Sequence, residues 1–163
     1  RIGDSIYVSG KLGLAKLGLK LSTSKKIKFS SLEKDSLEKF LKPKIQITLG
    51  INLRKIANSC IDISDGLLGD LNHICKESQV GAELEKDLIP FVGTFEEAMT
   101  WGDDYELCFT VPKNKERKLK DISKKIKIKL YKIGQIVSGK NIKIFENKQA
   151  ISLNKKSYNH FLK

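Results

Sequence analysis

The sequence predicts a layered α+β domain in which helices flank a mixed β-sheet. Segments with the apolar period of helices and segments with the alternation of strands follow one another irregularly, which disfavours a doubly wound parallel sheet. The last recognisable elements are two short strands that form a hairpin. The 163 residues can build a core of their own, and no linker or internal repeat divides them, so one domain is expected over residues 1–163.

In the first half of the chain, each expected element follows from the spacing of its apolar residues. The spacing predicts, in order, a strand over 5–9, a turn over 10–13, helices over 14–21, 31–42 and 44–58, a buried strand over 59–63 and a helix from about residue 66. Ser30 and Glu33 have the spacing of a capping box at the start of the second helix, and Pro43 ends that helix.

In the second half, Thr94 and Glu97 repeat the capping-box spacing ahead of a short helix. The clearest strand covers 104–111, where Tyr105 and the apolar residues after it alternate with smaller and polar side chains. Gly134 is expected to bend the strand in which it lies. The remaining patterns predict a strand over 81–85, a loop over 88–90, a helix over 115–126, a strand over 127–137 and a hairpin of 142–145 with 150–153.

The net charge of +12 at pH 7 raises the question of a nucleic-acid partner. Only Arg1, Arg54 and Arg117 are arginines, whereas base recognition favours arginine and aromatic platforms. The lysines are spread over many segments, so we expect no nucleic-acid partner, although a non-catalytic basic binding module stays an alternative. No apolar run approaches the roughly 20 residues that cross a bilayer, so no membrane partner is expected either.

The three cysteines, Cys60, Cys75 and Cys108, are far apart and set among apolar neighbours. This pattern indicates buried thiols in a reducing cytoplasm and argues against zinc or disulfides. The two histidines are too few and too separated for a histidine-based metal site. The chain starts at Arg1 without a secretory signal or an initiating Met, and we expect that it begins inside a longer protein.

The most informative segment is the turn between the strand over 59–63 and the helix after it. Asp62, Ser64 and Asp65 supply three oxygen-bearing side chains within four residues, and Gly66 permits a sharp turn. Such hard oxygen ligands suit Mg²⁺, and the N-terminus of the following helix suits phosphate. The alternative is that Ser64 or Asp65 only caps the helix. From the residues alone the two interpretations are about equally supported.

A second acidic segment precedes the clearest strand. Asp103, Asp104 and Glu106 could together hold a cation or a cationic ligand. A solvated turn is the simpler interpretation, because Gly-Asp pairs are common in turns. The glycines between Gly3 and Gly13 match no phosphate-binding motif and are interpreted as turn residues.

These segments resemble a known family. IDISDGLLGDLNHI, followed by SQVGAELEKDLIP and GDDYELCFTVP, is similar to the C-terminal half of thiamine-monophosphate kinase, within the superfamily of aminoimidazole-ribonucleotide synthetase. GDSIYVSGKLGLAKLGL resembles the first strand and helix of that half, and SYNHF resembles its tail. Sister families carry a Thr-Gly-Gly type sequence in place of Ser64, Asp65 and Gly66, which favours the thiamine branch. The resemblance implies the C-terminal fold of the aminoimidazole-ribonucleotide synthetase type.

It also implies an activity: transfer of the γ-phosphoryl group of ATP to thiamine monophosphate, giving thiamine diphosphate and ADP. By motif, Asp62 and Asp65 would bind Mg²⁺ and Ser64 would contact ATP. Asp103 would contact the thiamine moiety, and Tyr158 would line the substrate site. No general base is expected, because the acceptor is a phosphate oxygen whose second pKa is about 6.

Two residues depart from the family pattern. Asp103 stands where the family usually has Glu, which shortens the reach by one methylene group, and Trp101 replaces the first of two glycines. These departures concern substrate contact, so a related ATP-dependent phosphotransferase with another substrate stays an alternative. The family's N-terminal domain, which supplies most metal ligands, further ATP contacts and the homodimer interface, would lie outside this chain. We therefore expect residues 1–163 alone to fold and to be inactive.

Overall fold

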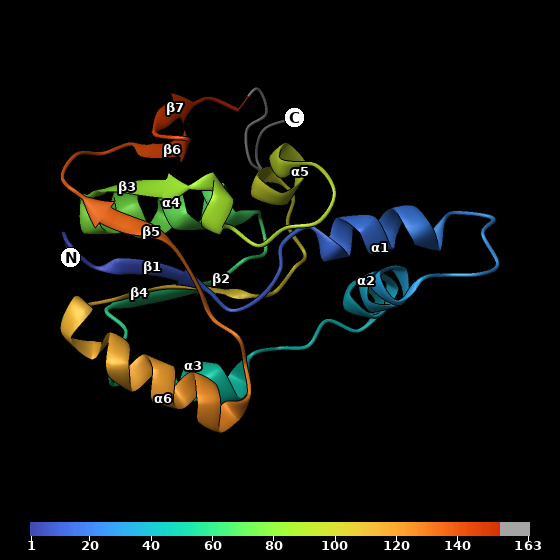
Figure 1. Cartoon of the computed structure of the whole chain (residues 1–163), viewed down its shortest axis with the longest axis horizontal. Coiled ribbons are helices and arrows are strands. Elements are labelled where there is room, and N and C mark those ends of the chain that lie inside the picture. The colour runs from blue at the N-terminus through green and yellow to red at the C-terminus, as the bar shows by residue number, and fades with distance from the viewer. Residues whose placement is uncertain (154–163) are drawn as a thin grey trace.

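The fold is built on a seven-stranded mixed β-sheet, against which helices pack (Figure 1). The structure is a computed structural model that describes residues 1–153. The strands lie in the order β2-β4-β1-β5-β3-β6-β7, and only β3 and β6 pair in parallel. Their bounds are β1 Ser5–Val8, β2 Ser59–Asp62, β3 Gly81–Glu85, β4 Leu107–Val111, β5 Tyr131–Val137, β6 Ile142–Glu146 and β7 Gln149–Ile151. The expected α+β class with a mixed sheet is confirmed.

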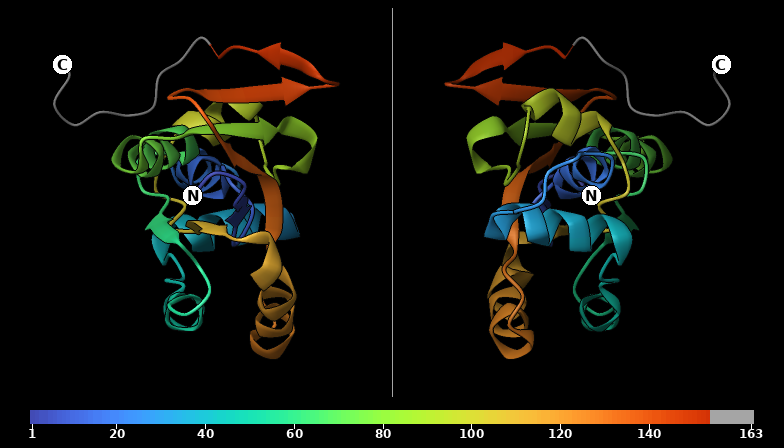
Figure 2. Two further views of the ribbon diagram at one scale, coloured as in Figure 1. Left: turned by 90° about the vertical axis from the view of Figure 1, so that its left-hand side faces the viewer. Right: turned by 90° about the vertical axis from the view of Figure 1, so that its right-hand side faces the viewer.

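The helices fall into three groups. Figures 1 and 2 show α3 and α6 together on one side of the sheet, while α1 and α2 lie side by side at one end of the molecule. The third group, α4 and α5, packs on the opposite side of the sheet from α3 and α6. The bounds are α1 Leu14–Ser22, α2 Ser31–Leu41, α3 Ile47–Leu53, α4 Leu67–Ser78, α5 Phe95–Thr100 and α6 Glu116–Ile126, with 3₁₀ turns at Lys86–Leu88 and Lys113–Lys115. No helix among residues 1–153 is long and apolar enough to cross a membrane.

Alternation along β1 and β4 divides the core in two. Ile6 and Cys108 point to the face that α4 and α5 cover, where Leu67, Leu71 and Met99 are fully buried. The intervening residues, Tyr7 and Phe109, are paired across the two strands and point to the other face. Their rings stack with centroids 5.7 Å apart, and they pack with Leu49 and Leu53 of α3 and Leu119 of α6.

Several expected boundaries were wrong. The helix expected over 44–58 is only α3, because the backbone turns after Leu53, whose carbonyl accepts the N–H groups of Ile56 and Ala57. The strand expected from 104 begins at Leu107, since Tyr105 has a φ of 48°. The strand expected from 127 begins at Tyr131, since α6 ends with Lys127 in the left-handed region.

The strand expected to be buried, β2, lies at the edge of the sheet and is half exposed. Cys60 is consequently exposed, whereas Cys75 and Cys108 are buried as expected. The bend expected at Gly134 coincides with a bulge. Ile6 lies opposite Gly134 and Tyr7 opposite Lys132, so Ile133 is an extra residue on β5.

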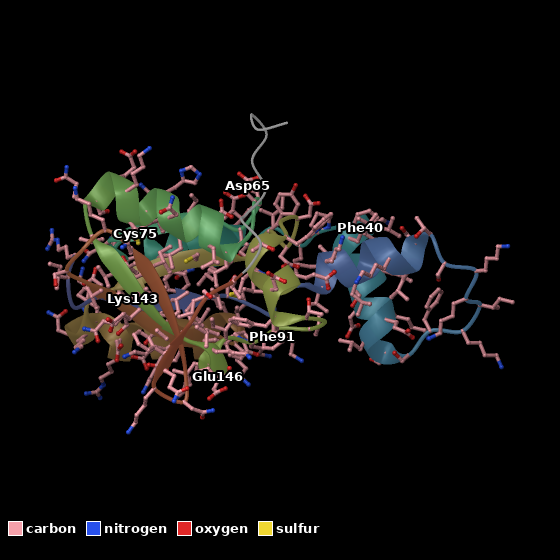
Figure 3. All side chains as sticks on the ribbon, turned by 90° about the horizontal axis from the view of Figure 1, so that it is seen from above. Phe40, Asp65, Cys75, Phe91, Lys143 and Glu146 are labelled. Atoms are coloured by element: carbon pink, nitrogen blue, oxygen red, sulfur yellow. The ribbon has the colours of Figure 1, made fainter. Side chains whose placement is uncertain are left out.

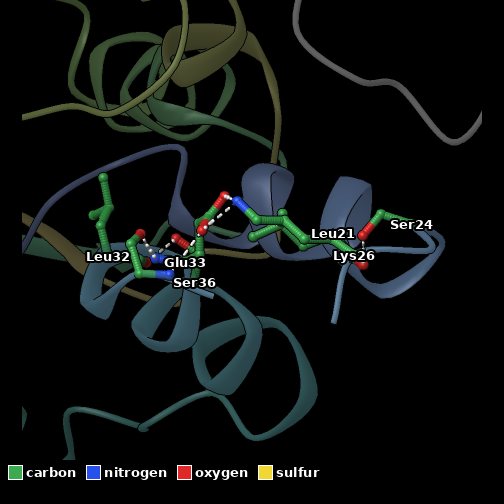
Figure 4. A network of polar contacts seen from close by, with 7 residues as sticks. Leu21, Ser24, Lys26, Leu32, Glu33 and Ser36 are labelled. Carbon is green, nitrogen blue, oxygen red and sulfur yellow. Dashed lines mark hydrogen bonds and ion pairs between the residues drawn. The ribbon is translucent and has the colours of Figure 1, made fainter. Parts of the chain in front are cut away.

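Polar contacts tie the loop between α1 and α2 to the start of α2 (Figure 4). The expected capping box is present: the Ser30 N–H donates to Glu33 Oε2 at 2.8 Å, and the Glu33 N–H donates to Ser30 Oγ at 3.3 Å. Lys26 Nζ donates to the same carboxylate at 2.6 Å and lowers the pKa of Glu33. Gly18 of α1 faces the backbone of Ser36 in α2 so closely that a Cβ would overlap its carbonyl oxygen.

The close approach at Gly18 gives a stability prediction. Gly18→Ala is expected to lower the free energy of unfolding by about 1–3 kcal/mol, because the added methyl group must displace the α2 backbone. Gly50→Ala in α3 is the matched control, since its Cβ would meet only Leu107 Cδ1, at 3.9 Å. It is expected to be neutral or to add up to about 1 kcal/mol from helix propensity. Urea denaturation checks both values, and equal midpoints for the two variants would contradict the packing.

Candidate functional site

The two acidic segments found in the sequence lie side by side at the ends of β2 and β4. Beyond the regular strand pairing, the Ile63 N–H donates to the Glu106 carbonyl at 2.7 Å and the Tyr105 N–H donates to the Ile63 carbonyl at 2.9 Å. The Asp103 N–H donates to the Ser64 carbonyl at 3.1 Å. Segments about 40 residues apart in the sequence therefore form one corner, which we call the acidic corner (residues 62–66 and 102–106).

Two glycines allow the backbones of this corner to come so close. A Cβ on Gly102 would overlap the Ser64 carbonyl group. Gly66 has a φ of 103°, and a Cβ there would lie 2.7 Å from the carbonyl carbon of Thr100, at the end of α5. Each motif thus contains its glycine because another backbone passes at that point.

Asp70, in the first turn of α4, binds the backbone of the 62–66 turn. Its carboxylate is 2% exposed, and Oδ2 accepts the N–H groups of Ser64 at 3.0 Å and Asp65 at 3.1 Å. The N-cap of α4 is Gly66, with no side-chain capping hydrogen bond. The interpretation of Ser64 or Asp65 as the N-cap residue was therefore wrong, because Gly66 occupies that position.

Three carboxylates of the corner reach the surface. Asp62 and Asp103 are exposed and Asp65 is half-buried; Figure 3 shows Asp65 between α4 and α5. Tyr105 lies among them, with its hydroxyl 3.5 Å from Asp103 Oδ1. Partial burial raises the pKa of Tyr105, and the charges of Asp103, Asp62 and Asp65 raise it further. All three carboxylates are thus within electrostatic reach of one phenol.

The corner is strongly acidic in a basic chain. Burial raises the pKa of Asp70 to about 6 against the stabilising N–H groups of Asp65 and Ser64, and the charges of Asp65 and Asp62 add to the rise. Carboxylates this close disfavour one another's ionised forms, which a bound cation would relieve. The chemistry of the corner therefore favours a cation.

The oxygen ligands of Asp62 and Asp65 fit Mg²⁺ in kind, since Mg²⁺ is often held by one or two carboxylates together with water and phosphate oxygens. Within residues 1–153, no group of three or more His, Cys, Asp or Glu side chains is arranged to hold a metal ion.

The other two acidic residues of the second segment point inward, which sequence reasoning missed. Asp104 is fully buried, and its carboxylate accepts the N–H groups of Gly13 at 2.6 Å and Ala15 at 3.1 Å, at the start of α1. Burial raises the pKa of Asp104 to about 6, although these two N–H groups oppose the shift. Two predictions for this segment were wrong. Its three carboxylates do not face one cation, and the segment is not a solvated turn, because Asp104 and Glu106 are buried.

Glu106 is 5% exposed and links three elements. Its carboxylate accepts the Ser9 hydroxyl at 2.5 Å, the Gln46 amide at 3.1 Å and the Lys39 ammonium group of α2. The Ser9 hydroxyl in turn accepts the Leu107 N–H at 2.8 Å. Strand alternation does not reveal these directions, because β4 begins only at Leu107 and both Asp103 and Tyr105 have positive φ angles.

The remaining predicted residues lie as follows. Trp101 ends α5, half-buried, and Lys16 Nζ of α1 lies 3.2 Å from the centroid of its ring. Tyr158 lies outside the described residues. Two hollows on the described surface, of about 210 and 390 Å³, contain none of the residues that the sequence singled out.

The chain is similar to known proteins over most of its length. Residues 1–147 match the family described as AIR synthase related protein, C-terminal domain. The thiamine-monophosphate kinase of Buchnera aphidicola subsp. Schizaphis graminum is 40% identical over 172 residues, covering 98% of this chain and 53% of the relative.

Two solved structures are similar along nearly the whole chain. The thiamine-monophosphate kinase of Stenotrophomonas maltophilia K279a is 31% identical, with a TM-score of 0.80 over 93% of this chain and 52% of that protein. A structure described as AaThiL complexed with AMPPCP and TMP is 28% identical, with a TM-score of 0.81 over 99% of this chain and 52% of that protein.

The chain spans about half the length of the relatives that it matches. The expected resemblance to thiamine-monophosphate kinases is confirmed by sequence and by fold. The chain therefore belongs to the family of AIR synthase related proteins, as a C-terminal domain of that family.

Proposed function

We propose that this chain is the C-terminal part of a kinase that transfers the γ-phosphoryl group of ATP to thiamine monophosphate. The observation that carries the proposal is the acidic corner, where three backbone hydrogen bonds join Ile63 and Ser64 of the 62–66 turn to the 102–106 segment. They bring the segment that contains Asp62, Ser64 and Asp65 next to the segment that contains Asp103. The relatives named thiamine-monophosphate kinase and the related structure with AMPPCP and TMP support the assignment of the two substrates.

In this proposal the nucleotide lies on the 62–66 side of the corner. Asp62 and Asp65 hold Mg²⁺, and the Ser64 side chain contacts ATP. The N-terminal end of α4 starts at the same turn, and its dipole favours phosphate. Bound Mg²⁺ would neutralise the phosphate charge that develops in the reaction. The other metal ligands come from ATP, water and the N-terminal domain of the complete protein.

The acceptor lies on the 102–106 side. The Asp103 carboxylate is exposed, and thiamine carries a cationic thiazolium ring, so a charge-assisted contact fits. Asp103 is set by a backbone with a φ of 66°, which turns its side chain away from the buried Asp104. The contact of Tyr158 with the same substrate stays a prediction.

The proposed reaction needs positioning more than acid–base chemistry. An oxygen of the thiamine-bound phosphate attacks the γ-phosphorus of ATP, the bond from that phosphorus to the bridging oxygen breaks, and ADP leaves. The attacking oxygen is already largely anionic at neutral pH, because the second pKa of a phosphate monoester is about 6. Asp62 and Asp65 would hold the metal, Ser64 would contact ATP and Asp103 would contact the thiazolium ring. Together they would keep the two phosphate groups in line. We also propose that the complete enzyme is a cytoplasmic homodimer.

The first test is the reaction itself. The full-length protein that contains this chain is expected to form thiamine diphosphate from thiamine monophosphate and ATP in the presence of Mg²⁺, measured by chromatography. Asp65→Asn is expected to lower kcat at least about a hundredfold, because the metal and its phosphates lose a ligand. Residues 1–163 alone are expected to form no product. Preference for another phosphate monoester, or activity that persists in EDTA, would overturn the proposal.

The second test concerns the acceptor. Asp103→Asn in the full-length protein is expected to raise KM for thiamine monophosphate about tenfold and to leave KM for ATP unchanged, because only the thiazolium contact loses its charge. Asp121→Asn is the matched control, since Asp121 is an exposed carboxylate on α6, remote from the corner. Steady-state kinetics with each substrate varied in turn checks the difference. An equal rise in both KM values would contradict a specific contact between Asp103 and the thiazolium ring.

A further inference from the structure

We infer that Asp70 is a positioning residue for this site: its buried carboxylate fixes the backbone of Ser64 and Asp65 so that their side chains are presented to the nucleotide. The inference rests on the proposed function for the reaction that it serves. Its geometric part stands on the hydrogen bonds alone.

The backbone of the turn is held on both sides. The carbonyl groups of Ile63 and Ser64 accept N–H groups from the second acidic segment, those of Tyr105 and Asp103. The N–H groups of Ser64 and Asp65 go to Asp70. The Ser64 N–H group is thus bound by Asp70 and its carbonyl group by Asp103, so both hydrogen-bonding groups of this peptide segment are held by other parts of the chain.

Asp70 is suited to this task because it lies on a rigid element. It is in the first turn of α4, which is anchored by the fully buried Leu67 and Leu71 on either side of it. The Asp70 N–H donates to the carbonyl group of Gly66, the N-cap of α4, at 3.0 Å. Asp70 is therefore joined directly to the last residue of the 62–66 turn. A small movement of the Asp70 side chain would therefore move Ser64 and Asp65 together.

A purely electrostatic role is the competing explanation, since the Asp70 charge also faces Asp65 and Asp62. The two explanations can be separated because both N–H groups go to the same oxygen, Oδ2. Asp70→Asn keeps one carbonyl oxygen that can accept both N–H groups, and it removes the charge. Asp70→Ala removes the acceptor and the charge together.

The experiment compares Asp70→Asn and Asp70→Ala in the full-length protein by steady-state kinetics. Asp70→Asn is expected to keep kcat/KM for MgATP within about threefold of the wild type. Asp70→Ala is expected to lower it about tenfold or more and to raise the Mg²⁺ concentration needed for half-maximal rate, while KM for thiamine monophosphate stays unchanged because Asp103 keeps its backbone bond to Ser64. Equal losses in the two variants would overturn the positioning role in favour of charge.

Hydrogen exchange gives a readout that does not depend on activity. The amides of Ser64 and Asp65 are expected to lose protection in Asp70→Ala and to keep it in Asp70→Asn. Ile74→Ala is the control for general weakening of α4, because Ile74 is buried on the same helix and touches neither bond. Unchanged exchange in Asp70→Ala, or equal exposure in Ile74→Ala, would overturn the inference. If the wild type makes no thiamine diphosphate, the proposed function fails while the exchange experiment still decides the inference.

Discussion

The site depends on the close approach of two backbones beyond the ends of β2 and β4. The carbonyl groups of Ile63 and Ser64 are bound by N–H groups of the 102–106 segment, and Gly102 leaves the room for that approach. This contact fixes the backbone that carries the acidic side chains of the 102–106 segment. Asp103 faces solvent, while Asp104 and Glu106 are carried inward to bind the start of α1 and the Lys39 side chain of α2.

Apart from the half-buried Asp65, the acidic residues in the corner and beside it divide into two groups with opposite requirements. The buried group, Asp70, Asp104 and Glu106, must be fully hydrogen-bonded, because an unpaired buried carboxylate is costly. Each has at least two donors within hydrogen-bonding distance. The exposed group, Asp62 and Asp103, costs nothing in desolvation and can meet a cation. The buried carboxylates therefore stabilise the structure of the corner, and the exposed carboxylates remain available to a ligand.

The sequence was sufficient for the elements whose pattern is local. β1, α2 with its capping box, β3 and the terminal hairpin lie where periodicity predicts them, because each is specified by its own residues. The acidic turn was found for the same reason. Long-range contacts were not predictable: Asp70 looks like an ordinary polar residue in a helix, and only the fold shows that it reaches back to Ser64.

Boundaries failed where tertiary contacts override local pattern. Asp103 and Tyr105 sit in alternating sequence typical of a strand, yet both have positive φ angles because the chain must pass Ser64 before it joins the sheet. The edge position of β2 was equally hidden, since an apolar run does not reveal how many neighbours a strand has. The inward direction of Asp104 was also hidden, because its two neighbours leave the strand conformation.

The strand order has a consequence for how the protein is made. Among the strands described here, β1 and β2 come first in the chain, but they do not pair with each other. Both pair with β4: Ile6 lies opposite Thr110, and Cys60 lies opposite Phe109. Such distant pairings close slowly, because the entropy of long loops is lost before any contact is gained. Until β4, which ends at Val111, has left the ribosome, β1 and β2 lack the strand that lies between them, and the acidic corner cannot form. β4 joins the two halves of the site, so the site can form only after β4 has been synthesised.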